Sequence, residues 1–221
     1  MTVLGIETST KTCAVALVHD GDLVAEYRHK QARIHAEILA GLVDKLMVTS
    51  GVNWSELQGI GVSSGPGSYT GLRIGMSLAK GLAFAHSLPI AGIPTTSAIA
   101  RSLIGLYDRF TVVLPSRKGE IYVAAYKSEA DELRTIENAQ ALLLTDFSSW
   151  AGGVAYVAGP GVSALQAAHI DGIKVIPEQF WQIGALNVAA IAAEKFAEGK
   201  ADDLDSLEPN YVKPFYTTAK I

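Results

Sequence analysis

The chain carries, at residues 65–75, the stretch Gly65-Pro66-Gly67-Ser68-Tyr69-Thr70-Gly71-Leu72-Arg73-Ile74-Gly75. The apolar run at residues 60–62 before it is typical of a buried strand, and residues 71–85 have the spacing of an amphipathic helix. Residues 89–93 then predict another short strand. A strand, a helix and a strand in this order indicate a crossover between parallel strands, and therefore an α/β fold.

Three β-prone runs open the chain and predict the start of a sheet, at residues 3–6, 13–18 and 23–27. The Asp20-Gly21 pair between the last two runs suits a hairpin turn. Apolar residues recur at helical spacing over residues 34–47, and Gly51 is typical of a residue that ends a helix. After Pro94 we expect a third helix, with Thr95 or Thr96 as its N-cap.

The same plan restarts at Phe110. Residues 111–114 and 121–126 predict another hairpin, followed by mixed helical and strand segments, and residues 184–198 predict the last long helix. The tripeptide at residues 159–161 repeats Gly65-Pro66-Gly67, although one shared tripeptide is weak evidence of duplication.

Composition restricts the function classes. The chain has 221 residues, of which 49% are hydrophobic, so it can form a packed core. Its 18 basic and 22 acidic residues give a net charge of −4, whereas a protein that binds nucleic acid unaided usually has a positive excess. Cys13 is the single cysteine, which excludes an internal disulfide and favours a reducing compartment. With no signal peptide or membrane-spanning run, we expect a cytoplasmic protein without a membrane partner.

The glycine-rich stretch permits two interpretations that the residues alone leave open. Gly65, Gly67 and Ser68 could hold an anion, because backbone amides are exposed where a helix begins. They could equally form a structural turn with a capped helix. Glu7 and Ser9 follow the first strand and could face a nucleotide, since ligands meet strand ends in parallel sheets, or they could simply form a hydrogen-bonded turn.

Small residues recur every fourth position along the second helix, at Gly71, Gly75, Ala79 and Ala83. They make a groove into which another helix could pack closely. The partner could be a second protein or the other half of the same chain, and the pattern leaves both readings open. Metal and nucleophile motifs are absent: the histidines do not form His-Glu-x-x-His, and no Gly-x-Ser-x-Gly elbow is present.

Several segments together resemble the TsaB (YeaZ) family over nearly the whole chain. They are residues 4–9 (Leu-Gly-Ile-Glu-Thr-Ser), the glycine-rich stretch, residues 92–96 (Gly-Ile-Pro-Thr-Thr) and residues 208–212 (Glu-Pro-Asn-Tyr-Val). The resemblance implies the actin, Hsp70 and sugar-kinase (ASKHA) superfold, with two similar α/β halves. We place them at residues 1–104, with the partner-docking helices, and at residues 105–221, the smaller half.

The resemblance also implies a non-catalytic subunit in the formation of threonylcarbamoyladenosine at adenosine 37 of tRNA. The larger paralogue TsaD performs the transfer, and TsaD-like proteins follow the Gly-Ile-Pro-like segment with two metal-binding histidines four residues apart. The matching positions here are Thr95 and Ile99, neither of which replaces an imidazole as a ligand. We therefore expect no catalytic residue, no metal ligand and no tightly bound cofactor, with ATP used by partner subunits.

Expected partners are a TsaD-type paralogue in a heterodimer, a TsaE-type ATPase, tRNA through the complex, and a second copy when the chain is alone. In this family the first two long helices look like the docking surface, although the pattern leaves open which faces point outward. The expected interface residues are Ile38, Leu42, Leu46, Gly71, Ile74, Gly75 and Leu78. Gly75→Glu should then abolish pairing while the monomer stays folded.

Two other functions compete with this interpretation. An ATP-dependent phosphotransferase is possible in the sugar-kinase superfold, because Glu7 and Ser9 sit where phosphate contacts occur in such folds. A metallopeptidase is disfavoured by the missing histidine pair. Direct tRNA binding by the basic and aromatic tail, which includes Lys213, Phe215 and Tyr216, is weighed against a tail packed on the protein.

Overall fold

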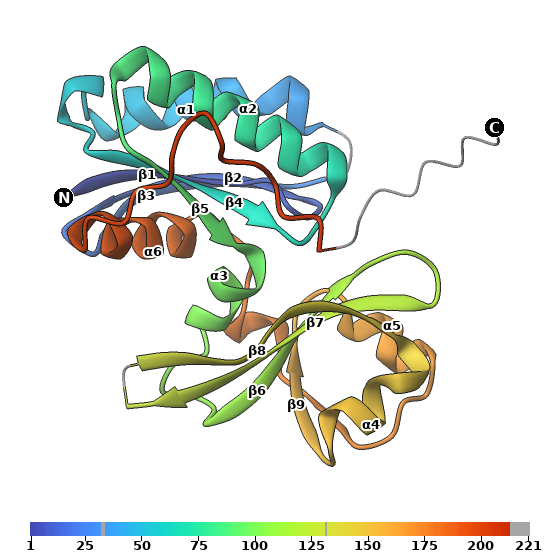
Figure 1. The fold of residues 1–221 in the computed structure, drawn as a ribbon. Coiled ribbons are helices and arrows are strands. Elements are labelled where there is room, and N and C mark those ends of the chain that lie inside the picture. Colours follow the sequence, from blue (N-terminus) through green and yellow to red (C-terminus); the bar gives the residue numbers. More distant parts are fainter. Residues whose placement is uncertain (32–33, 131, 213–221) are drawn as a thin grey trace, which may run out of the picture.

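The fold is that of a computed structural model, which describes residues 1–31, 34–130 and 132–212. Two five-stranded sheets, one from each half of the chain, lie one above the other (Figure 1). Within the described residues, no helix is both long enough and apolar enough to cross a membrane. The basic and aromatic tail at residues 213–221 lies outside the described residues.

The first sheet has the strand order β3-β2-β1-β4-β5. Its strands are β1 (Thr2–Glu7), β2 (Thr12–His19), β3 (Asp22–Lys30), β4 (Gly59–Gly65) and β5 (Ile90–Pro94). β1 pairs antiparallel with β2 and parallel with β4, which in turn pairs parallel with β5. Every residue of β1 and β4 is buried, because helices cover both faces of the sheet.

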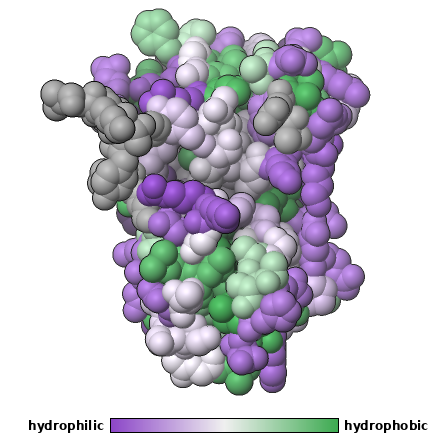
Figure 2. Space-filling model, turned by 90° about the vertical axis from the view of Figure 1, so that its right-hand side faces the viewer, coloured by the Kyte–Doolittle hydropathy of each residue, from purple (hydrophilic) through white to green (hydrophobic). Residues whose placement is uncertain are grey.

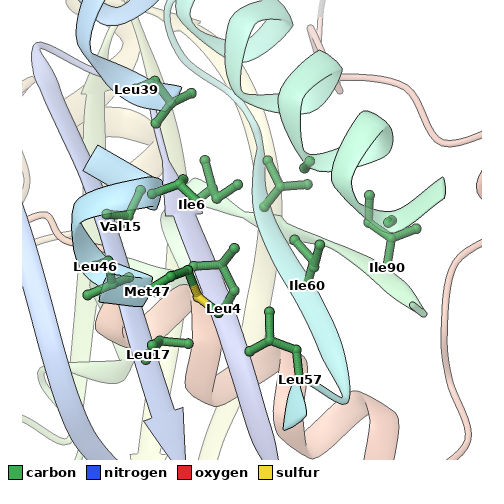
Figure 3. Packing of buried hydrophobic residues seen from close by; sticks show 14 of the residues in the cluster. Leu4, Ile6, Val15, Leu17, Leu39, Leu46, Met47, Leu57, Ile60 and Ile90 are labelled. Carbon is green, nitrogen blue, oxygen red and sulfur yellow. The ribbon is translucent and has the colours of Figure 1, made fainter. Parts of the chain in front are cut away.

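Two long helices, α1 (His35–Ser50) and α2 (Tyr69–His86), cover one face of this sheet. The helix α6 (Leu186–Ala197) covers the other face (Figure 1). Leu39, Leu46 and Met47 of α1 pack onto Leu4 and Ile6 of β1 (Figure 3). This apolar contact is the core of the first half and fixes the position of α1 and α2.

The second sheet repeats this arrangement, with the order β10-β9-β6-β7-β8. Its strands are β6 (Arg109–Pro115), β7 (Glu120–Glu129), β8 (Glu132–Leu143), β9 (Ala155–Ala158) and β10 (Ile173–Val175). When the second sheet is read in the opposite direction, β6 takes the place of β1 and β9 takes the place of β4. Gly159 then follows β9 in the same way that the glycine-rich stretch follows β4. The two similar α/β halves expected from the resemblance are confirmed.

Shorter helices complete both halves. They are α3 (Thr95–Arg101), α4 (Phe147–Ala151) and α5 (Val162–Ala167), with 3₁₀ turns at Trp54–Glu56, Leu144–Asp146 and Glu178–Phe180. The expected N-cap of α3 is wrong: Pro94 holds that position, while Thr95 and Thr96 are buried inside the helix. Thr96 Oγ1 instead accepts a hydrogen bond from Tyr126 Oη (2.8 Å).

The last part of the chain returns to the first half. Although α6 lies after the expected boundary at residues 104 and 105, it packs on β1, β4 and β5. The following residues 202–211, here called the C-terminal strap, run past β5 and α2 (Figure 1). Gly92 N donates to Asp202 Oδ2 (2.8 Å), and Asn210 N donates to Ser64 O (2.7 Å). The division into two domains stays a prediction; among the described residues, α6 and the C-terminal strap come after residue 105 but pack on the first half.

Candidate functional site

The glycines of the stretch 65–75 are closed in by the protein's own chain. A Cβ atom at Gly67 would overlap the carbonyl oxygen of Ser9, and one at Gly71 would overlap that of Thr8. At Gly75 it would overlap Thr8 Oγ1, and at Gly65 it would overlap the carbonyl oxygen of Asn210. These glycines therefore allow α2 and the C-terminal strap to approach β1 and β4, which favours the structural interpretation of the stretch over a phosphate cradle.

The turn between β1 and β2 holds the start of α2. Ser68 N donates to the carbonyl oxygen of Ser9 (2.6 Å), and Ser68 Oγ accepts from Gly71 N (3.2 Å) as the N-cap of α2. The side chain that satisfies a free amide at the helix start is thus supplied locally. Sequence reasoning found Ser9 and Ser68 but not that they meet each other.

Glu7 is the most perturbed acid of the described residues. It is 0% exposed, and its Oε1 accepts from Ser9 N (2.6 Å) and Ser9 Oγ (2.5 Å). Its Oε2 has no hydrogen-bond partner among the described residues. Burial raises the pKa of this carboxyl from 4.5 to about 7, and the hydrogen bonds from Ser9 lower it only in part.

A cleft of about 1410 Å³ lies between the two halves. The wall from the first half is largely polar and carries Ser9, Gly67 and Ser68. The wall from the second half is mixed, with Leu114 and Val162 beside polar residues such as Gln166. Figure 2 views the molecule from the right of Figure 1, and shows a strongly hydrophilic group at mid-height above a hydrophobic area. Of the candidate ligand residues, only these three line the cleft; Glu7 and Gly65 do not.

Charged side chains border the cleft but are mostly paired. Arg28 Nη1 donates to Gln182 Oε1 (2.8 Å), and Lys30 forms an ion pair with Glu178 (2.6 Å). Both contacts join β3 of the first half to the segment that leads into α6. These contacts border one end of the cleft, and because both are exposed each contributes little to stability.

Three of the seven expected interface residues are buried inside the chain, which corrects that expectation. Leu46 is 0% exposed and belongs to the core, while Gly71 and Gly75 face β1 and Thr8. The small-residue groove of α2 therefore receives the protein's own turn after β1. The other four, Ile38, Leu42, Ile74 and Leu78, pack on the core and remain partly exposed.

The positions that match the histidines of TsaD-like proteins offer no metal ligands. Thr95 is 0% exposed with an unpartnered Oγ1, and Ile99 packs in the apolar core of the second half. Among the residues that the structure describes, no three His, Cys, Asp or Glu side chains gather as a metal site would need. Residues of these types do not fit a catalytic divalent metal.

Sequence reasoning missed the contacts of the C-terminal strap. Arg73 lies over the Tyr69 ring (4.0 Å to the centroid), and its Nε donates to Tyr211 Oη (2.9 Å). Lys80 Nζ donates to the carbonyl oxygens of Asp205 and Leu207. Local sequence carries no signal for these contacts, because each joins residues more than a hundred positions apart in the chain.

The comparisons with known proteins fit this geometry. The profile of a family described as "TsaD: tRNA N6-adenosine threonylcarbamoyltransferase" matches residues 22–197. The "tRNA threonylcarbamoyladenosine biosynthesis protein TsaB" of Escherichia coli (strain K12) is 28% identical, with 96% of this chain and 95% of that protein covered. The protein of the same name from Bacillus subtilis (strain 168) is 30% identical over 66% of this chain and 64% of its own length.

Among solved structures, "YeaZ from Pseudomonas aeruginosa" superposes with a TM-score of 0.82 at 25% identity, covering 95% of this chain and 99% of that one. The activator of 2-hydroxyisocaproyl-CoA dehydratase from Clostridium difficile, with bound ADPNP, superposes with a TM-score of 0.51 at 13% identity, covering 90% and 97%. The second likeness concerns the fold alone.

Proposed function

We propose that this chain acts as a non-catalytic subunit. It belongs to the TsaB (YeaZ) family, which lies within the broader family whose model is described as TsaD, and it takes part in forming threonylcarbamoyladenosine in tRNA. The observation that carries the proposal is the closed glycine-rich stretch. Its glycines receive the protein's own backbone, and the positions where the enzyme's metal ligands would stand hold Thr95 and Ile99. Such a chain supports its paralogue by association.

The proposed partner is a TsaD-type paralogue that docks on α1 and α2. The docking surface, here called the outer helix face, comprises the partly exposed Ile38, Leu42, Ile74 and Leu78 with the exposed Gly41 and Gly81. Gly41 follows Ile38 by three residues and Gly81 follows Leu78 by three, so each lies beside its apolar neighbour. Apolar side chains beside bare backbone allow a facing helix to pack closely. When the chain is alone, a second copy takes the same face.

Gly41→Glu and Gly81→Glu are expected to abolish this pairing and leave the fold intact. A Cβ atom at either glycine meets nothing within 4 Å, and glutamate suits a helix better than glycine, by roughly 0.5 kcal/mol or more. A buried, unpaired charge in the interface should weaken binding at least about 100-fold. Light scattering and titration against the TsaD-type protein measure the loss.

Asn138→Glu is the matched control, because residue 138 is exposed on β8, far from α1 and α2 in the sequence and on the other sheet. Its pairing should equal that of the unsubstituted chain. Unchanged pairing in both glycine variants would show that the partner docks elsewhere.

The function is tested by reconstitution with TsaD-type and TsaE-type proteins, ATP, threonylcarbamoyl-adenylate precursors and tRNA. Modification of adenosine 37 should require this chain, and the isolated chain should modify no tRNA. We propose that ATP is consumed by the partner subunits, that no cofactor stays on this chain, and that the reaction takes place in the cytoplasm. Modification that continues without this chain would refute an essential supporting role.

An ATP-dependent phosphotransferase is the second candidate, and the cleft is the observation that favours it. Ser9, Lys11 and Ser68 line its polar wall, where an anion could meet hydroxyl and ammonium groups. ATP-dependent phosphorylation by the isolated chain, lost in Lys11→Ala, would support this candidate. A metallopeptidase lacks support from any residue cluster described above.

A further inference from the structure

The chain passes between its two halves twice, and the two passages meet at one place. The first passage is α3, which leads from β5 to β6. The second is the segment at residues 176–185, which leads from β10 to α6. A hinge between the halves has to bend these two segments, because no other part of the described chain joins the two sheets.

The Glu7 carboxyl lies where the two passages meet. It borders a small space together with Ala98 and Ile99 of α3 and residues 182–184 of the second passage. Its Oε1 is satisfied by Ser9, but its Oε2 has no partner among the described residues. A neutral carboxyl fits this apolar junction, whereas a carboxylate would leave a charged oxygen without donors.

The surrounding groups do not neutralise a charge at Glu7. Glu7 takes part in no ion pair found among the described residues, and β4 offers it only the hydroxyl of Ser63. The cation that contacts the second passage, Arg28, is bound to Gln182 and to Glu26. Glu26 in turn accepts from Ala185 N and Leu186 N. Burial, and to a lesser extent the charge of Glu7, raise the pKa of the Cys13 thiol to about 11. The thiol therefore stays neutral.

We propose that the Glu7 carboxyl is a proton-controlled latch on the hinge between the two halves. The protonated group keeps α3 and residues 182–184 packed together. Loss of the proton to solvent leaves a carboxylate that must be hydrated, and water reaches Oε2 only by parting the two passages. Ionisation therefore loosens the hinge and widens the cleft.

The latch works near neutral pH because burial raises the pKa of Glu7 to about 7. His35 is another titratable group at the cleft, with its Nε2 3.2 Å from the carbonyl oxygen of Thr12. The remaining charged groups that border the cleft are Lys11, Lys30, Arg117 and Glu178. The test must therefore separate Glu7 from His35.

Spin labels on Lys11→Cys and Ser163→Cys report the width of the cleft, since both residues are exposed and line opposite walls. The native Cys13 is buried and stays unlabelled. Pulsed electron paramagnetic resonance should find a longer, broader distance distribution at about pH 8.5 than at about pH 5.5, with a midpoint near the pKa of Glu7. In Glu7→Gln, which leaves His35 in place, the distribution should stay narrow at both pH values.

Two results would overturn the proposal. One is a distance between the two spin labels that does not change with pH when Glu7 is present, and the other is the same pH response in Glu7→Gln. If Glu7→Gln does not fold, carbon-13 NMR of the labelled Glu7 carboxyl decides the question instead. A titration near the ordinary glutamate value of about 4.3, or one that leaves the amide signals of residues 182–184 unmoved, would also overturn it.

Discussion

Gly75→Glu is expected to destabilise the first half by about 4 kcal/mol or more, and not merely to prevent pairing. The position faces Thr8 across a contact with no room for a Cβ atom, because the new atom would overlap Thr8 Oγ1. A glutamate would also place a charge between α2 and the end of β1, where the described neighbours offer no cation. Urea denaturation followed by circular dichroism measures the loss.

Gly81→Glu is the matched control, since it makes the same change six residues later on the exposed side of α2. It should keep the full unfolding free energy. A second check removes the opposing hydroxyl: in Gly75→Ala, the added substitution Thr8→Ala should recover part of the lost stability through their coupling. A Gly75→Glu monomer as stable as the unsubstituted chain would contradict the observed packing.

The stability of the protein is expected to fall as pH rises from about 4.5 to about 7, on account of Glu7. The folded carboxyl has the higher pKa, so the folded state holds more protons than the unfolded state in this window. Deprotonation then favours unfolding, and the effect levels off above the folded pKa. A rise from 4.5 to about 7 corresponds to on the order of 3 kcal/mol.

Other acids act outside this window and in the opposite sense. Hydrogen bonds lower the pKa values of four other carboxyl groups, because each carboxylate accepts from a side chain, a backbone amide or the N-terminus. These groups are Asp20, Glu56, Glu129 and Asp203. The stability that these four carboxylates give the folded state is lost as pH falls below their ordinary pKa values and through the lowered ones. Stability should therefore be greatest around pH 4.5 to 5 as far as carboxyl groups decide it.

Glu7→Gln isolates the contribution of Glu7, because an amide has a similar shape and no charge. Its unfolding free energy, measured by urea denaturation at a series of pH values, should lose the decline between about pH 4.5 and about pH 7. Above that range the variant should be at least as stable as the unsubstituted chain. An unchanged decline would assign the effect to another group.

The periodic elements were predictable because their burial is nearly complete on one or both faces. β1, β2, β4, α1 and α2 consist of apolar runs that the sequence displays directly. β8 was not predicted as a strand: its residues Glu132–Leu143 are largely exposed and carry little apolar alternation. It is a strand because β7 supplies hydrogen-bonding partners along its length, and pairing of this kind is not visible in local sequence.

The candidate site also contains some residues that local sequence reveals and some contacts that it does not. Ser9, Gly67 and Ser68 were found because turn chemistry is local. The strap contacts of Arg73 and Lys80 join residues more than a hundred positions apart in the chain, so no spacing rule indicates them. Which side of α2 is buried also depended on Thr8, a residue 67 positions before Gly75.

By its sequence alone, the protein is an α/β chain of two similar halves in the TsaB family, with Thr95 and Ile99 where a metal site would need imidazoles. The α/β order follows from the spacing of apolar residues, whereas the two halves, the family and the positions that match the metal ligands follow from the resemblance of particular segments to that family. Only the tertiary structure decided that the small-residue groove of α2 is filled by the chain itself and that Glu7 lies between the two passages. Those facts depend on close contacts between distant segments, whose geometry exists only after the sheets and helices have packed.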